Sequence, residues 1–150
     1  MSLKPGNRAG SKERKQLSLF FIERPAINPT LFAEECGINR KTFSFFYNGR
    51  YYTSLEKWAK INSCMKKYGF RNIYRKGAPN IEREERVALF FQFLEDYPAI
   101  FVYKFAQECC MSKENMRDIK ASKTSISKRL WPKIWKAMCK YGYKPPYIQS

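Results

Sequence analysis

Two stretches of this chain match each other at a constant offset of 73 residues, without a gap. The match runs from Arg14 to Phe70 and contains 16 identities over 57 positions. The longest identical runs are Pro25-Ala26-Ile27 with Pro98-Ala99-Ile100, and Lys67-Tyr68-Gly69 with Lys140-Tyr141-Gly142. Because each copy must form the same structural unit, a repeat of this kind decides the architecture. Since there are only two copies, we predict tandem small domains and not a solenoid.

The domain boundaries are set by where the apolar pattern stops. We predict a flexible basic arm over residues 1–10, which have no apolar period. The two domains are predicted over 11–73 and 81–150, the second with a short C-terminal tail. Residues 74–80 form the predicted linker, because glycine and proline interrupt any helix there. Twelve Phe, ten Tyr and three Trp provide apolar area for a core in each half.

Apolar residues recur at helical spacing along both copies. The patterns predict helices over 11–23, 29–36, 40–48 and 54–68 in the first copy, and from Asn80, then over 102–109, 113–120 and 127–141 in the second. Runs with the alternating pattern of a strand are missing. The predicted fold class is therefore all-α.

The charge of the chain indicates its kind of partner. The net charge is +16, from 29 Lys and Arg against 13 Asp and Glu. A surplus of this size repels itself and is relieved by a polyanion such as a nucleic acid. The sequence therefore favours nucleic-acid binding as the starting hypothesis.

The residues that several other classes of protein need are missing. The chain has no His and no Cys-x-x-Cys pair, and we see no Gly-rich phosphate loop, so we predict no enzyme, no cofactor and no metal site. Cys36 and Cys109 lie in apolar patterns, as buried thiols in a reducing compartment do. No signal peptide and no apolar run near 18 residues is found, so we expect no membrane partner. The expected location is the cytoplasm, with nucleoid association in a bacterium.

The segment 29–48 carries the motif on which the functional hypothesis depends. Gly37 comes after a short helix, where the chain must adopt a left-handed conformation to turn sharply. Asn39 is placed to cap the next helix. Phe43 and Phe46 then face inward. Two short helices joined by a tight Gly-containing turn form the helix-turn-helix pattern.

The residues after this motif also match the layout of a known family. Asn48-Gly49-Arg50 ends the second helix, and Ser54 begins another one with Trp58 and Ile61 on its apolar side. In these features the segment 17–70 resembles the Cro/repressor-like helix-turn-helix family, here duplicated in tandem. The resemblance implies two tandem repressor-like helical domains, and DNA binding through the helix 40–48 in the major groove.

On a helical wheel, one side of the helix 40–48 lies opposite the two core phenylalanines. The residue types on that side and at its edges can read base edges, because Asn pairs with adenine, Lys or Arg with guanine, and Phe contacts the thymine methyl group. The predicted base-reading residues are Arg40, Lys41, Thr42, Ser44, Phe45 and Asn48. For Phe45, packing on the other repeat is an open alternative.

Phosphate contacts are expected just after this helix, where the next helix N-terminus favours anions. The candidates are Arg50, Tyr51 and Ser54 in the first copy, and Lys123, Thr124 and Ser127 in the second. For the two serines, a purely structural N-cap is an equal alternative.

The second copy departs from the pattern of the first. Cys110 stands where the first copy has Gly37, which strains a left-handed turn or changes it. The second recognition helix presents Glu114 and Asp118, and acids facing DNA weaken binding unless they accept from cytosine. Its candidate DNA contacts are Lys113, Asn115, Arg117 and Lys120. This domain either contacts only the DNA backbone, reads a different sequence, or binds a protein partner.

Together these features predict a double-stranded DNA-binding protein with tandem helix-turn-helix domains that acts as a transcriptional regulator. Its size and charge suit a phage or mobile-element setting. Two alternatives stay open. One is a structural or protein-interaction module, such as a virion component or a polymerase-binding inhibitor, that reuses this fold. The other is RNA binding, in which aromatic side chains stack on single strands.

Overall fold

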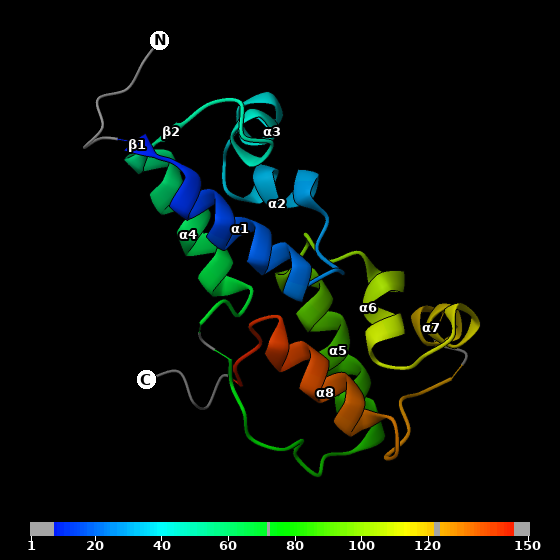
Figure 1. Cartoon of the computed structure of the whole chain (residues 1–150). Coiled ribbons are helices and arrows are strands. Elements are labelled where there is room, and N and C mark those ends of the chain that lie inside the picture. The colour runs from blue at the N-terminus through cyan, green and yellow to red at the C-terminus, as the bar shows by residue number, and fades with distance from the viewer. Residues whose placement is uncertain (1–7, 72, 122–123, 146–150) are drawn as a thin grey trace.

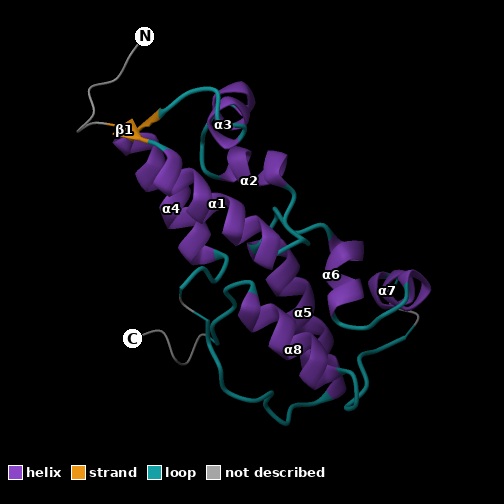
Figure 2. Ribbon diagram, viewed as in Figure 1, coloured by secondary structure: helices purple, strands orange, loops and turns teal. Residues whose placement is uncertain are grey.

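The computed structural model of the chain describes residues 8–71, 73–121 and 124–145 (Figure 1). Over these residues the protein is mostly helical, with eight helices and one two-stranded sheet, which confirms the all-α class in its broad sense. The elements are β1 (Arg8–Ala9), α1 (Ser11–Glu23), α2 (Pro29–Glu35), α3 (Arg40–Tyr47), β2 (Thr53–Ser54), α4 (Leu55–Lys67), α5 (Arg83–Asp96), α6 (Val102–Glu108), α7 (Lys113–Lys120) and α8 (Trp131–Lys140). Figure 2 shows the first repeat, up to α4, above and to the left of the second.

Six of the eight helices begin and end within one residue of their predicted bounds, and two begin later. The helix predicted from Asn80 begins at Arg83, with Glu82 as its N-cap. In the segment before it, the Pro79 carbonyl oxygen accepts from the indole N–H of Trp131 at 3.1 Å. The helix predicted from Ser127 begins at Trp131. One turn precedes it, in which the Ser127 carbonyl oxygen accepts from the Trp131 amide at 2.9 Å.

Each repeat encloses a core of aromatic rings at equivalent positions. In the first, the fully buried Phe20 ring lies 5.4 Å from Phe32 and 5.9 Å from Phe70, measured between ring centroids. In the second, Phe93 lies 5.4 Å from Phe105 and 6.1 Å from Tyr143. These pairs are related by the 73-residue offset. Because equivalent rings pack together in both copies, the repeats share one packing arrangement. Each buried ring contributes about 1.5–3 kcal/mol of hydrophobic stabilisation.

The end of the predicted flexible arm belongs to the first domain. Arg8 and Ala9 form β1, which pairs antiparallel with β2, so that Ala9 lies opposite Thr53 and is fully buried. The guanidinium of Arg8 lies 4.0 Å from the centroid of the Tyr52 ring. The prediction of an arm over residues 1–10 is therefore wrong for Arg8 and Ala9, because a two-residue strand is too short to produce an alternating pattern. Of the other residues of the predicted arm, Gly10 is the N-cap of α1, and residues 1–7 lie outside the described residues.

The two repeats meet through reciprocal backbone contacts. The Asn28 amide donates to the Ala99 carbonyl oxygen at 2.8 Å, and the Phe101 amide donates to the Ala26 carbonyl oxygen at 2.6 Å. Positions 28 and 101, and positions 26 and 99, are equivalent in the repeat. Between them, Ile27 and Ile100 form an antiparallel bridge. Each of these contacts between the repeats therefore occurs twice, the second time with the two repeats exchanged, which defines an isologous interface. The repeats are thus arranged about an internal twofold axis.

Two buried tyrosines complete this interface. The Tyr68 hydroxyl oxygen accepts from the Ala99 amide, and the Tyr141 hydroxyl oxygen accepts from the Ala26 amide, each at 3.0 Å. Each hydroxyl also donates to a glutamate of its own repeat, Glu35 or Glu108. Burial, reinforced by these carboxylates, raises the pKa of both tyrosines far above its usual value. The hydroxyls therefore stay protonated and can donate and accept at once.

Candidate nucleic-acid interface

The turn between α2 and α3 has the chemistry that its sequence predicts. Gly37 adopts a φ of +75°, a left-handed conformation. The next amide, that of Ile38, then donates back to the Ala33 carbonyl oxygen at 3.0 Å, which closes the end of α2. The Asn39 side-chain oxygen accepts from the Lys41 amide at 2.9 Å and caps α3. These local bonds fix the direction in which α3 leaves the turn.

Packing determines which side of α3 faces solvent. Phe43 and Phe46 are 4% and 1% exposed and lie in the core of the first repeat. Lys41, Ser44 and Asn48, which the helical wheel places on the opposite side, are exposed. The α3 helix therefore presents a polar face that carries one cation, a hydroxyl and an amide.

The exposed side chains of this face have only weak partners. The Asn48 amide nitrogen donates to the Ser44 hydroxyl at 3.1 Å, one turn away on the same face. Arg40 forms an ion pair with Glu34 at 2.7 Å, and both side chains are largely exposed. Surface contacts of this kind contribute little and break easily when a better partner arrives. Most of the predicted base-reading residues are thus accessible.

Phe45 and Thr42 are exceptions, because both are half-buried. The Phe45 ring lies 5.4 Å from the Tyr51 ring, and the Arg50 guanidinium lies 5.7 Å from the Phe45 ring centroid. Phe45 is therefore partly covered by Tyr51 and Arg50, which follow its own helix and are two of the predicted phosphate contacts.

Arg14 of α1 binds the C-terminal end of α3, and the sequence of α3 itself does not predict this contact. From α1 its Nε donates to the Phe46 carbonyl oxygen at 2.7 Å, and its Nη2 donates to the Tyr51 carbonyl oxygen at 3.4 Å. A cation at this end of a helix stabilises the unpaired carbonyls. The only signal in the sequence is that Arg14 lies three residues before Leu17, on the core side of α1.

The predicted phosphate contacts divide into two groups. Arg50, Tyr51 and Thr124 are exposed. The Ser54 hydroxyl accepts from the Lys57 amide, and the Ser127 hydroxyl accepts from the Leu130 amide, each at 3.1 Å. Ser54 is therefore the N-cap of α4, which was the alternative for it, whereas Ser127 makes the corresponding bond in the turn that precedes α8, whose N-cap is Leu130. Lys123 lies outside the described residues.

The acidic residues of α2, the helix before α3, are ion-paired. The α3 helix has Arg40 and Lys41 and no Asp or Glu. Of the two glutamates of α2, Glu34 pairs with Arg40 and Glu35 with Lys67. Lys41 is then the cation of α3 that has no ion-pair partner among the described residues.

The matching surface of the second repeat is built the same way but charged differently. Cys110 adopts a φ of +62°, and the Met111 amide donates to the Ala106 carbonyl oxygen at 2.9 Å, so the turn is that of the first repeat with a strained residue in it. Met116 and Ile119 face the core in place of Phe43 and Phe46. Of the remaining residues, Lys113, Glu114, Arg117 and Lys120 are exposed, whereas Asn115 and Asp118 are half-buried.

The internal twofold axis determines how the two short helices are arranged. Figure 1 shows α3 at the top of the molecule and α7 at its right-hand side, with the segment between α4 and α5 along the lower edge. The reciprocal contacts at Ile27 and Ile100 lie near the starts of α2 and α6, because each of these residues comes two positions before one of these helices. The α2–α3 and α6–α7 units are therefore presented as an inverted pair.

No group of three or more metal-ligating side chains occurs within the described residues. None of the helices in that part of the chain combines the length and the apolar character needed to cross a bilayer. Comparison of the chain with protein-family models, with curated proteins and with solved structures finds no match. The function is therefore inferred from the sequence and from the geometry of this surface.

Proposed function

We propose that this chain binds double-stranded DNA as a tandem helix-turn-helix protein, with α3 in the major groove. One observation carries the proposal: a two-turn helix, capped by Asn39 and anchored by Phe43 and Phe46, exposes a face with no acidic residue. An α-helix fits the width of the major groove. Lys41 and Asn48 on the exposed face have the chemistry to read guanine and adenine.

The internal twofold axis refines the kind of site. Two reading helices related by a twofold approach a duplex head to head, as the two subunits of a dimer do. None of the residues of α3 is identical to its counterpart in α7. The DNA site then consists of two half-sites in inverted orientation with different base sequences. Covalent linkage raises the effective concentration of the second unit once the first is bound. A protein of this kind acts as a transcriptional regulator.

The test is a selection of bound duplexes from a random library with the full chain, followed by titrations at several salt concentrations. We expect an enriched motif with two dissimilar inverted halves, and an affinity that falls steeply as salt rises, because each phosphate contact releases a counterion. An affinity independent of salt contradicts DNA binding. Direct instead of inverted halves contradicts the arrangement derived from the twofold axis.

A second function has one specific observation in its favour. The exposed Glu114 lies on α7 beside Lys113 and Arg117, and a surface of mixed charge suits a protein partner better than phosphate. If α7 contacts DNA, Glu114→Gln strengthens duplex binding by about 1 kcal/mol, because one repulsion is removed. The control is Glu95→Gln on α5, which is exposed. A protein partner that survives nuclease treatment and is lost in Glu114→Gln favours the second function.

A competition experiment distinguishes RNA binding from duplex DNA binding and from protein binding. Exposed Tyr51 and Tyr52, at 63% and 52%, offer rings on which single-stranded bases can stack. A single-stranded RNA that displaces the selected duplex at equal concentration, and loses affinity in Tyr51→Ala, favours RNA. Displacement only by duplex DNA supports the main proposal.

A further inference from the structure

Two cysteines of the first repeat are in contact, and the proposed function uses neither of them. Cys36 is the C-cap of α2, and Cys64 lies in the second half of α4. The Cys36 thiol is buried and hydrogen-bonds to the sulfur of Cys64, which is half-buried. Two thiols from different helices therefore meet in the first repeat, and solvent reaches one of them.

Neighbouring bonds hold the two helices in this arrangement. Glu35 accepts from the Tyr68 hydroxyl and from the Lys67 ammonium group, each at 2.5 Å. Glu35 comes just before Cys36, and Tyr68 lies one turn after Cys64. The end of α2 is therefore fastened to the end of α4 beside the two thiols, and their contact is part of the fold.

The two thiols differ in reactivity. The hydrogen bond from Cys36 lowers the pKa of Cys64, and the Lys67 charge acts in the same direction, against partial burial. The same hydrogen bond, together with burial, raises the pKa of Cys36. The thiolate is the form of cysteine that attacks a disulfide. Cys64 is therefore suited to attack an oxidant first, with Cys36 as the second thiol behind it.

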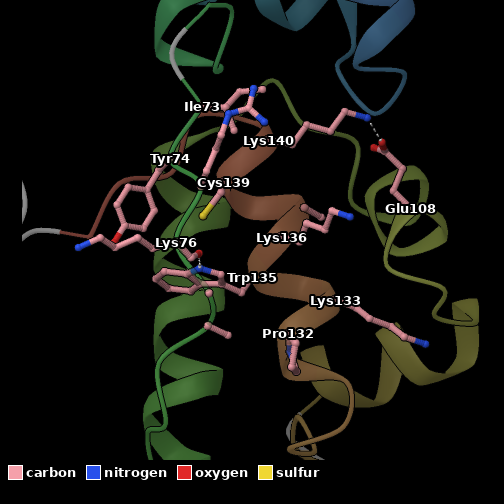
Figure 3. Close-up of a pocket in the computed structure, with 14 residues that line it drawn as sticks. Ile73, Tyr74, Lys76, Glu108, Pro132, Lys133, Trp135, Lys136, Cys139 and Lys140 are labelled. Atoms are coloured by element: carbon pink, nitrogen blue, oxygen red, sulfur yellow. Dashed lines mark hydrogen bonds and ion pairs between the residues drawn. The ribbon is translucent and has the colours of Figure 1, made fainter.

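The second repeat has the same framework without the pair. Figure 3 shows Lys140 paired with Glu108, the counterpart of the ion pair at the end of α2. Cys109 is buried at the position equivalent to Cys36. Where its partner thiol would be, the second repeat has Ala137. Cys109 is thus a natural control, a buried thiol at the same place in the fold with no second thiol facing it from α8.

The other two cysteines are poorly placed for a bridge to Cys109. Figure 3 shows Cys139 on the side of α8 that faces Tyr74, whereas Glu108, the neighbour of Cys109, lies beyond the other side. Cys110 directly follows Cys109, and adjacent Cα atoms lie about 3.8 Å apart, closer than an ordinary disulfide allows. Among the five cysteines, all of which the structure describes, the pair in the first repeat is therefore the one arranged to react.

We propose that Cys36 and Cys64 form a reversible disulfide with a small disulfide as oxidant, and that this bond locks the α2–α3 unit to α4. The Cys64 thiolate attacks one sulfur of the oxidant, so that a mixed disulfide forms and one thiolate leaves. The Cys36 sulfur then attacks the Cys64 sulfur and displaces the second thiolate. The two departing thiolates take up the two cysteine protons. The cysteines lose two electrons, and the oxidant becomes two thiols.

The bond acts on the turn that precedes α3. An S–S bond is about 2.05 Å long, shorter than any hydrogen-bonded contact between two sulfur atoms, so its formation draws the end of α2 toward α4. Gly37 follows Cys36 directly and begins, with its φ of +75°, the turn that sets the direction of α3. The bond therefore reaches α3 through this turn. It does so whatever α3 binds, so a failure of DNA binding leaves it unaffected.

The test is incubation of the reduced full chain with oxidised glutathione. The reaction is stopped with acid, the chain is unfolded and alkylated, and its peptides are mapped by mass. We expect a bond between Cys36 and Cys64, alkylated Cys109 and Cys139, and glutathione retained on the exposed Cys110. Dithiothreitol should restore all five thiols. Glutathione retained on Cys64, free thiols at both positions of the pair, or a bridge to another cysteine overturns the proposal.

Two variants test the order of attack. In Cys36→Ala, glutathione should stay on Cys64, because no second thiol displaces it. In Cys64→Ala, the buried Cys36 should be modified about tenfold more slowly than Cys64 is in the first variant. Cys109→Ala is the matched control, which removes the equivalent thiol of the second repeat and should leave the bridge unchanged. Equal modification of Cys36 and Cys64 overturns the order, and loss of the bridge in the control overturns the pairing.

Hydrogen exchange measures the lock, in Cys110→Ser so that no glutathione stays on the second repeat. The amides of the segment 29–48 should exchange about threefold more slowly, or slower still, after oxidation, because the bond opposes local opening. The equivalent segment 102–121 should exchange at an unchanged rate and is the internal reference. The same exchange rate for 29–48 in the oxidised and the reduced chain means that the bond does not hold the α2–α3 unit, and the lock is then refuted.

Discussion

The two repeats of this chain agree where they touch each other and differ where they face outward. The residues that are identical in both include the Pro-Ala-Ile and Lys-Tyr-Gly runs that form the reciprocal interface. None of the 16 identities falls between Gly37 and Thr53 or their counterparts, the region that contains α3 and α7. Most of the shared residues are thus buried in the two cores or at the contact between the repeats, although Lys60 and Lys133 are exposed. The outer helices are free to recognise different partners.

The largest expected effect tests the interface of the two repeats. A Cβ atom added at Gly69 would lie 2.2 Å from the Lys140 carbonyl oxygen, and one at Gly142 would lie 1.7 Å from that of Lys67. Because backbone cannot move aside as a side chain does, Gly69→Ala and Gly142→Ala should each lower the free energy of unfolding by about 3 kcal/mol or more. Urea denaturation measures the change.

Gly37→Ala is the control for this pair. Gly37 also has a positive φ, but nothing lies within 4 Å of an added Cβ atom. Gly37→Ala should therefore lower the free energy of unfolding by only about 1 kcal/mol, the steric cost of a left-handed conformation for alanine. If all three variants are destabilised equally, the close backbone approach between the repeats does not exist in solution.

The next effect tests the exposed face of α3. If α3 reads the major groove as proposed, Lys41→Ala and Asn48→Ala should each cost about 1–3 kcal/mol for the selected duplex and relax the preference at one base pair, because each would lose a base contact. Arg50→Ala should weaken all sequences about equally if its role is the proposed phosphate contact. Fluorescence anisotropy with the selected duplex and single-base variants of it measures both. Equal, sequence-independent losses from all three variants would contradict the assigned reading face.

Local sequence was sufficient to predict most of the helices, the left-handed turn at Gly37 and the inward direction of Phe43 and Phe46. These depend on residues within one or two turns of each other. The contacts of Arg14 with α3 and of Tyr68 with Ala99 could not be predicted, because they join residues more than 30 positions apart. The interface residues are identical in the two copies, and the sequence shows this. It does not show that the segment containing Tyr68 in one copy contacts the segment containing Ala99 in the other.

A further comparison concerns positions 24 and 97, which are equivalent in the repeat. Arg24 donates to the Gly69 carbonyl oxygen at 3.0 Å, and Tyr97 donates to that of Gly142 at 2.9 Å. Burial, with the nearby Asp96 charge, raises the pKa of Tyr97 to about 12. In the unfolded chain the hydroxyl ionises near its ordinary value of 10.0. Above pH 10 the unfolded state therefore binds fewer protons, and stability falls as pH rises toward 12.

The ionisation of Tyr97 should lower the free energy of unfolding by up to about 1.4 kcal/mol per pH unit between pH 10 and 12. The buried Tyr68 and Tyr141 add to it in the same direction, because the pKa of each is also raised. Tyr97→Phe should lose about 1 kcal/mol at pH 8 with its hydrogen bond, but show a shallower decline above pH 10. Urea denaturation from pH 8 to 11.5 checks the slope. An unchanged slope in Tyr97→Phe means that Tyr97 ionises equally in both states.

The smallest effect concerns the turn that the two repeats build with different residues. Gly37 and Cys110 have φ values of +75° and +62° at equivalent positions, but only glycine adopts this conformation without a steric penalty. Cys110 is exposed, so its side chain gains little packing in return. Cys110→Gly should therefore raise the free energy of unfolding by about 0.5–1 kcal/mol, after allowance for the greater freedom of glycine in the unfolded chain. Cys110→Ser keeps the Cβ atom and should give no gain. If the free energy of unfolding rises in both variants, the effect comes from removal of the thiol. The turn of the second repeat is then not strained.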